Sequence, residues 1–203
     1  TSAALTADLA KLTAASGTIS VTGASGQSFS VTKTQLDTLL ALEATGSGTI
    51  TVTGATSAAL NADTAKLTVA SGTKNIVGAS GQSFSVTKTV LNNYAALEAT
   101  GSGTITVTAA TGSALTADLA KLTAASGTIS VTGASGENLS VTKTQLNNLS
   151  ALEATGSGTI TVTAATGSAL TADLNKLTVA SGTISVTGAA NESFSVTKTQ
   201  LDT

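Results

Sequence analysis

The chain has 203 residues, of which 41% are hydrophobic, 10% charged and 2% aromatic. It contains no Cys and no His, which excludes disulfide scaffolds, thiolate metal sites and imidazole acid–base chemistry. The net charge of -2 leaves no basic stripe for phosphates, so nucleic acid is not an expected partner, and no apolar run approaches the ~18–20 residues of a membrane span.

A short marker, Ser-Gly-Thr-Ile-Thr-Val-Thr at residues 47–53, returns in close copies along the whole sequence. Equivalent leucines recur in constant 55-residue steps, at Leu5, Leu60, Leu115 and Leu170. The chain is therefore a single repeat array, residues 1–203, with repeats 1–55, 56–110 and 111–165 and a partial copy 166–203. Because both ends fall inside a repeat and arrays need polar caps, we expect a segment of a longer chain.

Each repeat divides into a 31-residue coil and a 24-residue coil, as the spacing of the marker glycines Gly17, Gly48 and Gly72 shows. In the first coil, alternating residues 18–22 predict a strand with Ile19 and Val21 inward. A second short strand begins at Phe29 after a glycine turn.

A helix is predicted after this second strand. The spacing of Thr32 and Gln35 is that of a capping box, which predicts a helix over residues 33–44. Its buried stripe is formed by Leu36, Leu39, Leu40 and Leu42.

The second coil begins with a strand at residues 49–53, followed by a predicted helix over residues 58–69 that matches residues 3–14. Leu5, Leu9 and Leu12 give that earlier copy one narrow apolar stripe. Asp8 and Lys11 of this helix type are interpreted as its solvated side. In the second repeat Lys74 replaces an inward Ile, so we expect either a snorkelling lysine stem or a distorted strand.

Strands that alternate with helices predict parallel pairing with right-handed crossovers. The predicted fold class is an α/β solenoid with a parallel sheet and stacked helices. Strands stack ~4.8 Å apart whereas helices need ~8–10 Å. The array therefore either curves with its helices outside or places the two helix types on different sides, and the sequence leaves both arrangements open.

The most regular outward feature is a candidate threonine ladder on these strands. Its members are Thr49, Thr51, Thr53, Thr104, Thr106, Thr108, Thr159, Thr161 and Thr163. Flat Thr-x-Thr arrays resemble ice-binding proteins, which makes ice a candidate partner and a surface glycan a second one. The plain structural interpretation is that Thr is a good strand former with a polar side, suited to any solvated sheet face.

Other motifs predict little chemistry. The carboxylates are dispersed and no Asp-x-Asp loop occurs, so no metal site, cofactor or catalytic residue is expected and an enzyme is disfavoured. Glycosylation sequons begin at Asn138, Asn148 and Asn191, but the first repeat lacks them and they are interpreted as accidental. Tyr94 replaces Leu39 of the first repeat as a packing variant.

Two motifs carry a resemblance across the array, Phe-Ser-Val-Thr-Lys-Thr-Gln-Leu at residues 29–36 and Leu-Thr-Ala-Asp-Leu-Ala-Lys-Leu at residues 5–12. They resemble the repeat regions of very large secreted bacterial surface proteins, including those of cyanobacteria. That resemblance implies an extracellular or cell-surface fibre, coat or adhesin stalk. Stacking repeats also predict self-association, either into fibres or with neighbouring copies.

Overall fold

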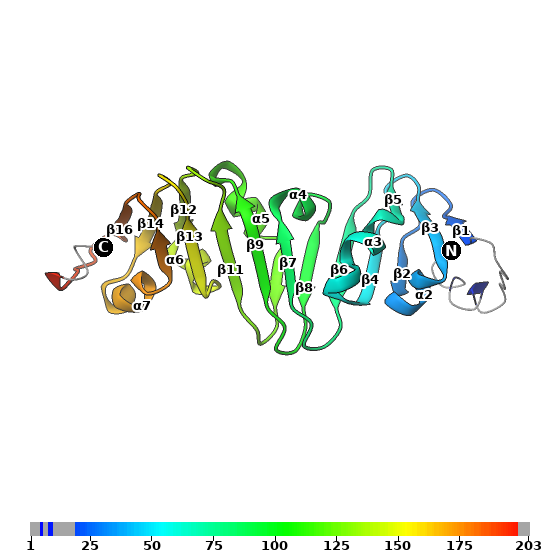
Figure 1. Ribbon diagram of the computed structural model, residues 1–203, viewed down its shortest axis with the longest axis horizontal. Coiled ribbons are helices and arrows are strands. Elements are labelled where there is room, and N and C mark those ends of the chain that lie inside the picture. The colour runs from blue at the N-terminus through cyan, green and yellow to red at the C-terminus, as the bar shows by residue number, and fades with distance from the viewer. Residues whose placement is uncertain (1–4, 6–7, 10–18, 199–203) are drawn as a thin grey trace. The chain divides into compact units, whose positions relative to one another are not determined.

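The computed structural model describes residues 5, 8–9 and 19–198. The fold is α/β, with parallel sheets built from repeated strand–helix units (Figure 1). The strands are β1 (Ile19–Thr22), β2 (Phe29–Thr32), β3 (Leu39–Ala44), β4 (Ile50–Ala55), β5 (Leu67–Val69), β6 (Lys74–Gly78), β7 (Phe84–Thr87), β8 (Ala96–Ala99), β9 (Ile105–Ala110), β10 (Leu122–Ala124), β11 (Ile129–Gly133), β12 (Leu139–Thr142), β13 (Ala151–Ala154), β14 (Ile160–Ala165), β15 (Leu177–Val179) and β16 (Ile184–Gly188). The α-helices are α2 (Lys33–Asp37), α3 (Leu60–Ala65), α4 (Lys88–Leu91), α5 (Leu115–Leu119), α6 (Lys143–Asn147) and α7 (Leu170–Leu174), and the 3-10 turns are η1 (Ser57–Ala59), η2 (Gly112–Ala114) and η3 (Gly167–Ala169).

The described strands form four sheets, named here by their order along the chain. The first sheet has the order β1-β3-β5, the second β10-β8-β6-β4-β2, the third β15-β13-β11-β9-β7 and the fourth β12-β14-β16. Consecutive strands from β1 to β6 alternate between the first and second sheets, and those from β11 to β16 alternate between the third and fourth. Neighbours in a sheet are therefore never consecutive in the chain, which is why their pairing is parallel.

The chain forms two compact units. The first comprises Thr1–Phe84, Asn92–Gly103 and Thr123–Gly127, and it holds the first two sheets except for Leu122. The second comprises Ser85–Leu91, Thr104–Leu122 and Thr128–Thr203, and it holds the other two sheets except for Phe84. Each unit thus has its own pair of sheets.

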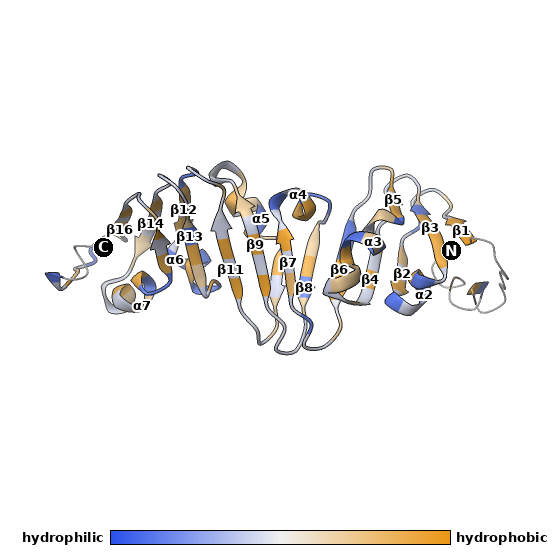
Figure 2. Ribbon diagram, viewed as in Figure 1, coloured by the Kyte–Doolittle hydropathy of each residue, from blue (hydrophilic) through white to orange (hydrophobic). Residues whose placement is uncertain are grey.

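The core of each unit consists of alternate strand residues, as a half-buried sheet requires. In β2 and β4, Phe29, Val31, Ile50 and Val52 are buried while the intervening Ser and Thr residues are not. Figure 2 shows the same banding of hydrophobic and polar residues along the strands. The two predicted strands of the first coil and the strand beginning near Thr49 are confirmed.

The predicted helix over residues 33–44 is wrong in its extent. The capping box between Thr32 and Gln35 is confirmed, but α2 ends at Asp37 and strand β3 follows. Ile19 pairs with Leu39 and Ser20 with Ala41, so Leu40 lies at a bulge with 54% of its surface exposed. Parallel pairing with β1 and β5 overrides the helical spacing of these leucines, because Leu39 and Leu42 are buried just as well from a bulged strand.

The predicted helix over residues 58–69 is also wrong in its extent. A 3-10 turn at Ser57–Ala59 precedes the six-residue α3, and Leu67–Val69 forms strand β5 against β3. The matching helix over residues 3–14 lies mostly outside the described residues. The residues of this range that are described, Leu5, Asp8 and Leu9, are helical. The helical spacing of apolar residues in these two ranges therefore covers a short helix and the strand that follows it.

The short helices also remove most of the expected conflict between helix and strand spacing. In the second sheet, α2 and α3 follow the neighbouring strands β2 and β4 and contact each other, whereas β6, β8 and β10 lead into turns. Only one pair of helices must therefore fit above a five-stranded sheet. Lys74 is half-buried and pairs with Ile50 of β4, so β6 is not distorted at this residue. The register shift between the two strands lies at their far end, between Thr53 and Ala55.

The Ser-Gly-Thr marker proves to be a site of close contact between neighbouring turns. A Cβ built on Gly72 would lie 1.8 Å from the carbonyl oxygen of Gly48, and one on Gly48 would lie 2.2 Å from that of Gln27. Ser71 Oγ donates to the Gly46 carbonyl at 2.8 Å, and Thr45 Oγ1 donates to the Gly23 carbonyl at 2.8 Å. Marker residues such as Ser71 and Gly72, together with Thr45 just before the marker, therefore let one turn lie directly on the next and bond to it.

The described part of the chain has no helix that is both long and apolar enough to cross a membrane.

Candidate functional site

The nine threonines of the candidate ladder lie on or directly before strands of three different sheets. Thr51 and Thr53 lie on β4 in the second sheet, Thr106 and Thr108 on β9 in the third, and Thr161 and Thr163 on β14 in the fourth. The other three, Thr49, Thr104 and Thr159, directly precede these strands. All nine are half-buried.

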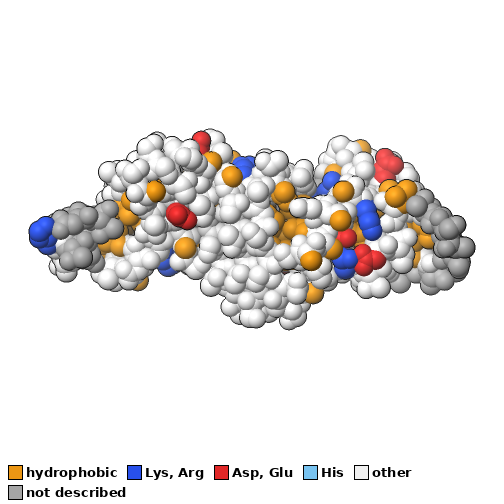
Figure 3. All heavy atoms as spheres, in the orientation of Figure 1, with side chains coloured by type: hydrophobic (Ala, Val, Ile, Leu, Met, Phe, Trp, Pro, Cys, Tyr) orange, Lys and Arg blue, Asp and Glu red, His pale blue; other side chains and the backbone are white. Residues whose placement is uncertain are grey.

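Within one sheet, the outward polar residues do align across neighbouring strands. In the fourth sheet Thr161 lies opposite Ser140 on one side and Ser185 on the other. In the third sheet Thr106 lies opposite Ser130, but the residue on the other side of Ser130, across the sheet, is Ala151. Hydroxyl rows are thus short. On the face seen in Figure 3 charged side chains are few, and several of them gather toward the right-hand end.

A glutamate interrupts the next row of outward residues in the first, second and third sheets. Glu43 Oε2 accepts from the hydroxyl of Thr22 at 3.1 Å, and Glu153 Oε2 accepts from that of Thr132 at 3.2 Å. Glu98 occupies the corresponding place opposite Val77. The outward faces therefore combine Thr, Ser, Ala and Glu rather than repeating a single side chain.

The most unusual polar group is a buried aspartate that recurs once per repeat. Asp63, Asp118 and Asp173 keep only 4%, 3% and 4% of their surface exposed. One oxygen of each pairs with a lysine of the preceding short helix. The Nζ–Oδ1 distances are 3.6 Å for Lys33–Asp63, 3.2 Å for Lys88–Asp118 and 3.0 Å for Lys143–Asp173.

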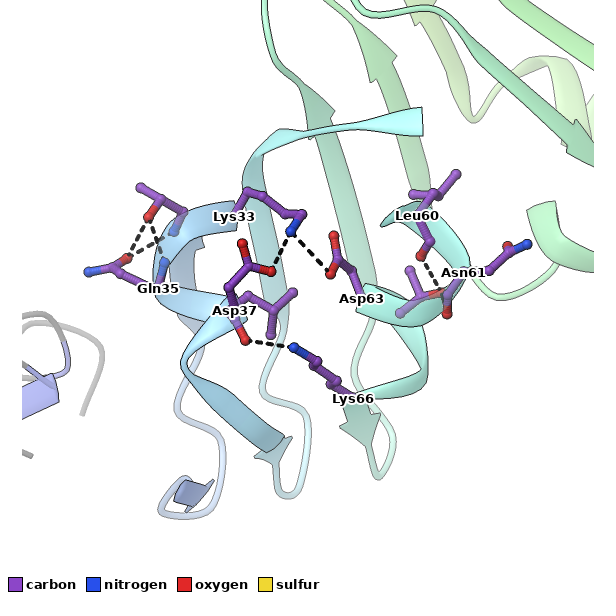
Figure 4. A network of polar contacts seen from close by, with 10 residues as sticks. Lys33, Gln35, Asp37, Leu60, Asn61, Asp63 and Lys66 are labelled. Carbon is purple, nitrogen blue, oxygen red and sulfur yellow. Dashed lines mark hydrogen bonds and ion pairs between the residues drawn. The ribbon is translucent and has the colours of Figure 1, made fainter. Parts of the chain in front are cut away.

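Each pair joins two neighbouring short helices. Lys33 is the first residue of α2, where a positive charge is unfavourable to the helix dipole, and its side chain reaches across to Asp63 in the first turn of α3 (Figure 4). A second bond runs the other way, because Lys66 Nζ donates to the Leu36 carbonyl at 3.1 Å. Lys176 makes the same bond to Leu146 at 3.0 Å, so the arrangement recurs in the second unit.

The other carboxylate oxygen, Oδ2 of Asp63, Asp118 and Asp173, is buried with no hydrogen-bond partner among the described residues. Burial raises the pKa of the Asp63 carboxyl, and the charge of Lys33 opposes that shift. Lys33 also bonds Asp37, and this hydrogen bond is the main reason why the pKa of Lys33 is raised. A buried ion pair with an unpaired oxygen contributes little net stability, but removing one partner is costly.

The sequence interpretation of these charges as a solvated side is confirmed at Asp8 but does not extend to the later repeats. Asp8 itself is exposed, but its counterparts at 55-residue steps, Asp63, Asp118 and Asp173, are buried. Its predicted partner Lys11 lies outside the described residues, while the corresponding pair Asp118–Lys121 is 3.8 Å apart. The missed signal is that these Asp and Lys residues recur unchanged in every copy, whereas the residue at Asp37 becomes Asn92 and Asn147.

The remaining predicted positions have structural roles. Asn138 Oδ1 accepts from the backbone amide and hydroxyl of Thr159, each at 2.9 Å, where Ser28 serves Thr49 in the first repeat. Tyr94 is buried, its hydroxyl donates to Thr64 Oγ1 at 3.4 Å, and burial raises its pKa. Among the described residues no cluster of three or more His, Cys, Asp or Glu could hold a metal ion.

Comparison with protein-family models, curated proteins and solved structures finds no match to this chain.

Proposed function

We propose that the chain is a structural, non-enzymatic repeat segment, an α/β solenoid of 55-residue repeats that serves as an extracellular fibre, surface coat or adhesin stalk. The observation that carries the proposal is the origin of the strands in each five-stranded sheet. The second sheet takes β2 and β4 from the first repeat, β6 and β8 from the second and β10 from the third. A single repeat cannot complete a sheet, so the repeats stabilise one another as an array.

The polar side chains support the same function. The buried Lys–Asp pairs, the Ser71-type hydroxyls and the Thr45-type hydroxyls all bond one segment to a segment of a neighbouring coil. Charged and hydroxyl groups in these places hold successive segments in register. A protein whose recurring chemistry joins each segment to the next is suited to bearing load along its length.

Variants with one or two additional copies of residues 56–110 test this proposal. Each complete repeat contributes five strands, and consecutive strands alternate between two sheets, so each added repeat should lengthen the array by about 2.5 strand spacings, or ~12 Å. Small-angle scattering and electron microscopy should show a constant increment in the longest dimension at constant cross-section. Growth in all directions, as in a globular particle, would contradict the proposal.

The surface role has its own test, in the cells that make the protein. Antibodies against the chain should label intact cells, and electron microscopy should show the label on thin fibres or a surface layer. Labelling only after the cells are opened would refute the extracellular role while leaving the repeat array itself intact.

A second candidate function is ice or glycan binding by the outward hydroxyls. It is favoured by the alignment of Thr161 with Ser140 and Ser185 across the fourth sheet. The interruptions at Ala151 and Glu153 make it the weaker candidate, because a regular lattice partner requires a regular surface. Thermal hysteresis of the purified chain tests the ice version, and its absence would remove that version.

A further inference from the structure

In the first unit, Lys33 lies between two carboxylates (Figure 4). Its Nζ is 3.6 Å from Oδ1 of Asp63, and it also donates a hydrogen bond to Oδ1 of Asp37, one helical turn further along α2. Asp63 is only 4% exposed, whereas the side chains of Lys33 and Asp37 are 19% and 52% exposed. A primary amine, a buried carboxyl group and a carboxylate that reaches solvent therefore meet at one place.

The arrangement leaves one polar atom without a partner. Oδ2 of Asp63 is buried and accepts no hydrogen bond from the described residues. Such an oxygen is costly, because it has lost its bonds to water and gained none in the protein. The ion pair with Lys33 engages Oδ1 and leaves that cost in place. A reaction that removes Oδ2 from the site would remove the cost with it.

We propose that Lys33 and Asp63 condense to an intramolecular isopeptide bond, with Asp37 as the group that carries the protons. The lone pair of the deprotonated Lys33 amine forms a bond to Cγ of Asp63. The bond between Cγ and Oδ2 breaks, and its electron pair leaves with the oxygen as water. Two of the three ammonium protons pass through Asp37 to that water, and the third stays on the amide nitrogen. Asp37 ends as a carboxylate, and no oxidant or further reactant is needed.

The surroundings favour the condensed product. The reacting groups are held together by two packed helices, and the near-complete burial of Asp63 keeps bulk water from the bond. Burial also raises the pKa of the Asp63 carboxyl, which favours the protonated form that an amine can attack. The new amide replaces two charges, and its N–H keeps Asp37 as an acceptor. Until the bond forms, Asp63 remains a titrating carboxyl group.

The later repeats differ at the residue that carries the protons. The Nζ–Oδ1 distances of Lys88–Asp118 and Lys143–Asp173 are 3.2 Å and 3.0 Å, shorter than in the first pair. The place of Asp37 is taken there by Asn92 and Asn147, whose amides do not exchange protons as a carboxylate does. We therefore expect these two pairs to stay ionic, so the chain contains its own controls.

Mass spectrometry of the whole chain, folded and incubated at neutral pH, tests the proposal. Its mass should be lower than that of the sequence by one water, not by three. Glu43 is the only glutamate between Lys33 and Asp63, so cleavage after it should leave the two fragments joined through these residues. The full sequence mass would overturn the proposal. So would the loss of one water with separate fragments, which is the result expected of a succinimide at a single aspartate.

Two exchanges between the repeats locate the proton carrier. Asp37→Asn gives the first repeat the side chain of the other two, so this variant should fold as the parent does but keep its full mass. Asn147→Asp should lose a second water and join Lys143 to Asp173. A joined Asp37→Asn chain, or an Asn147→Asp chain without the second bond, would overturn the proposal. The bond requires neither a fibre nor a surface location, so its failure would leave the proposed function untouched.

Discussion

Replacing Gly72 with Ala tests whether stacked turns organise this fold. The added Cβ would lie 1.8 Å from the Gly48 carbonyl oxygen, 2.6 Å from the Gly48 carbonyl carbon and 3.1 Å from the Ser47 oxygen. These atoms belong to backbone and cannot rotate away. Restoring a tolerable contact of about 3.0 Å requires the two turns to separate by about 1.2 Å.

That separation breaks the hydrogen bonds between the two turns. Ser71 donates to the Gly46 carbonyl from both its amide, at 3.0 Å, and its hydroxyl, at 2.8 Å, and the Ile50 amide donates to Thr73 at 2.9 Å. At ~1 kcal/mol for each hydrogen bond, Gly72→Ala should lower the free energy of unfolding by about 3 kcal/mol.

Gly54→Ala is the matched control in the same unit. Nothing lies within 4 Å of a Cβ built on Gly54, although its φ is +69°. The corresponding residues Ala109 and Ala164 already adopt φ +55°, so this change should cost only ~1 kcal/mol. Urea unfolding followed by circular dichroism measures both, and the reasoning fails if Gly72→Ala is no more destabilising than Gly54→Ala.

Four further outcomes are expected. Lys143→Met leaves the Asp173 carboxylate buried without its cation and should cost ~3–5 kcal/mol in urea unfolding, most of it recovered when Asp173→Asn is added. The raised pKa of Asp63 means that the folded state binds the proton more tightly. Its contribution to stability is therefore greatest below the ordinary value of 3.8 and is lost as the pH rises through the folded pKa. The measurement is the unfolding free energy of the parent minus that of Asp63→Asn, and a difference that does not fall between about pH 3 and pH 7 would contradict this. Tyr94 is the sole tyrosine, so its ultraviolet titration should have a midpoint above 10.0, and a midpoint at or below that value would refute its burial. Ala164→Gly relieves a left-handed backbone and should raise the free energy of unfolding by ~1 kcal/mol, measured in the same urea assay.

The sequence alone was sufficient for the elements whose signals are local. The alternation at Phe29 and Val31 and the capping box at Thr32 and Gln35 depend on residues close together in the chain, and both are confirmed. The parallel α/β class also follows, because repeated strands that are never joined by hairpins can pair only through crossovers.

Only the tertiary structure decided where the helices end and which charges are buried. Leu39, Leu42 and Ala44 suit a helix stripe or a bulged strand, and pairing with the distant strands β1 and β5 selects the strand. Asp63 resembles a surface helix residue until Lys33, from the preceding helix, comes to lie 3.6 Å from it. Local propensity cannot encode such choices, because their free energy comes from contacts between segments that become neighbours only when the chain has folded.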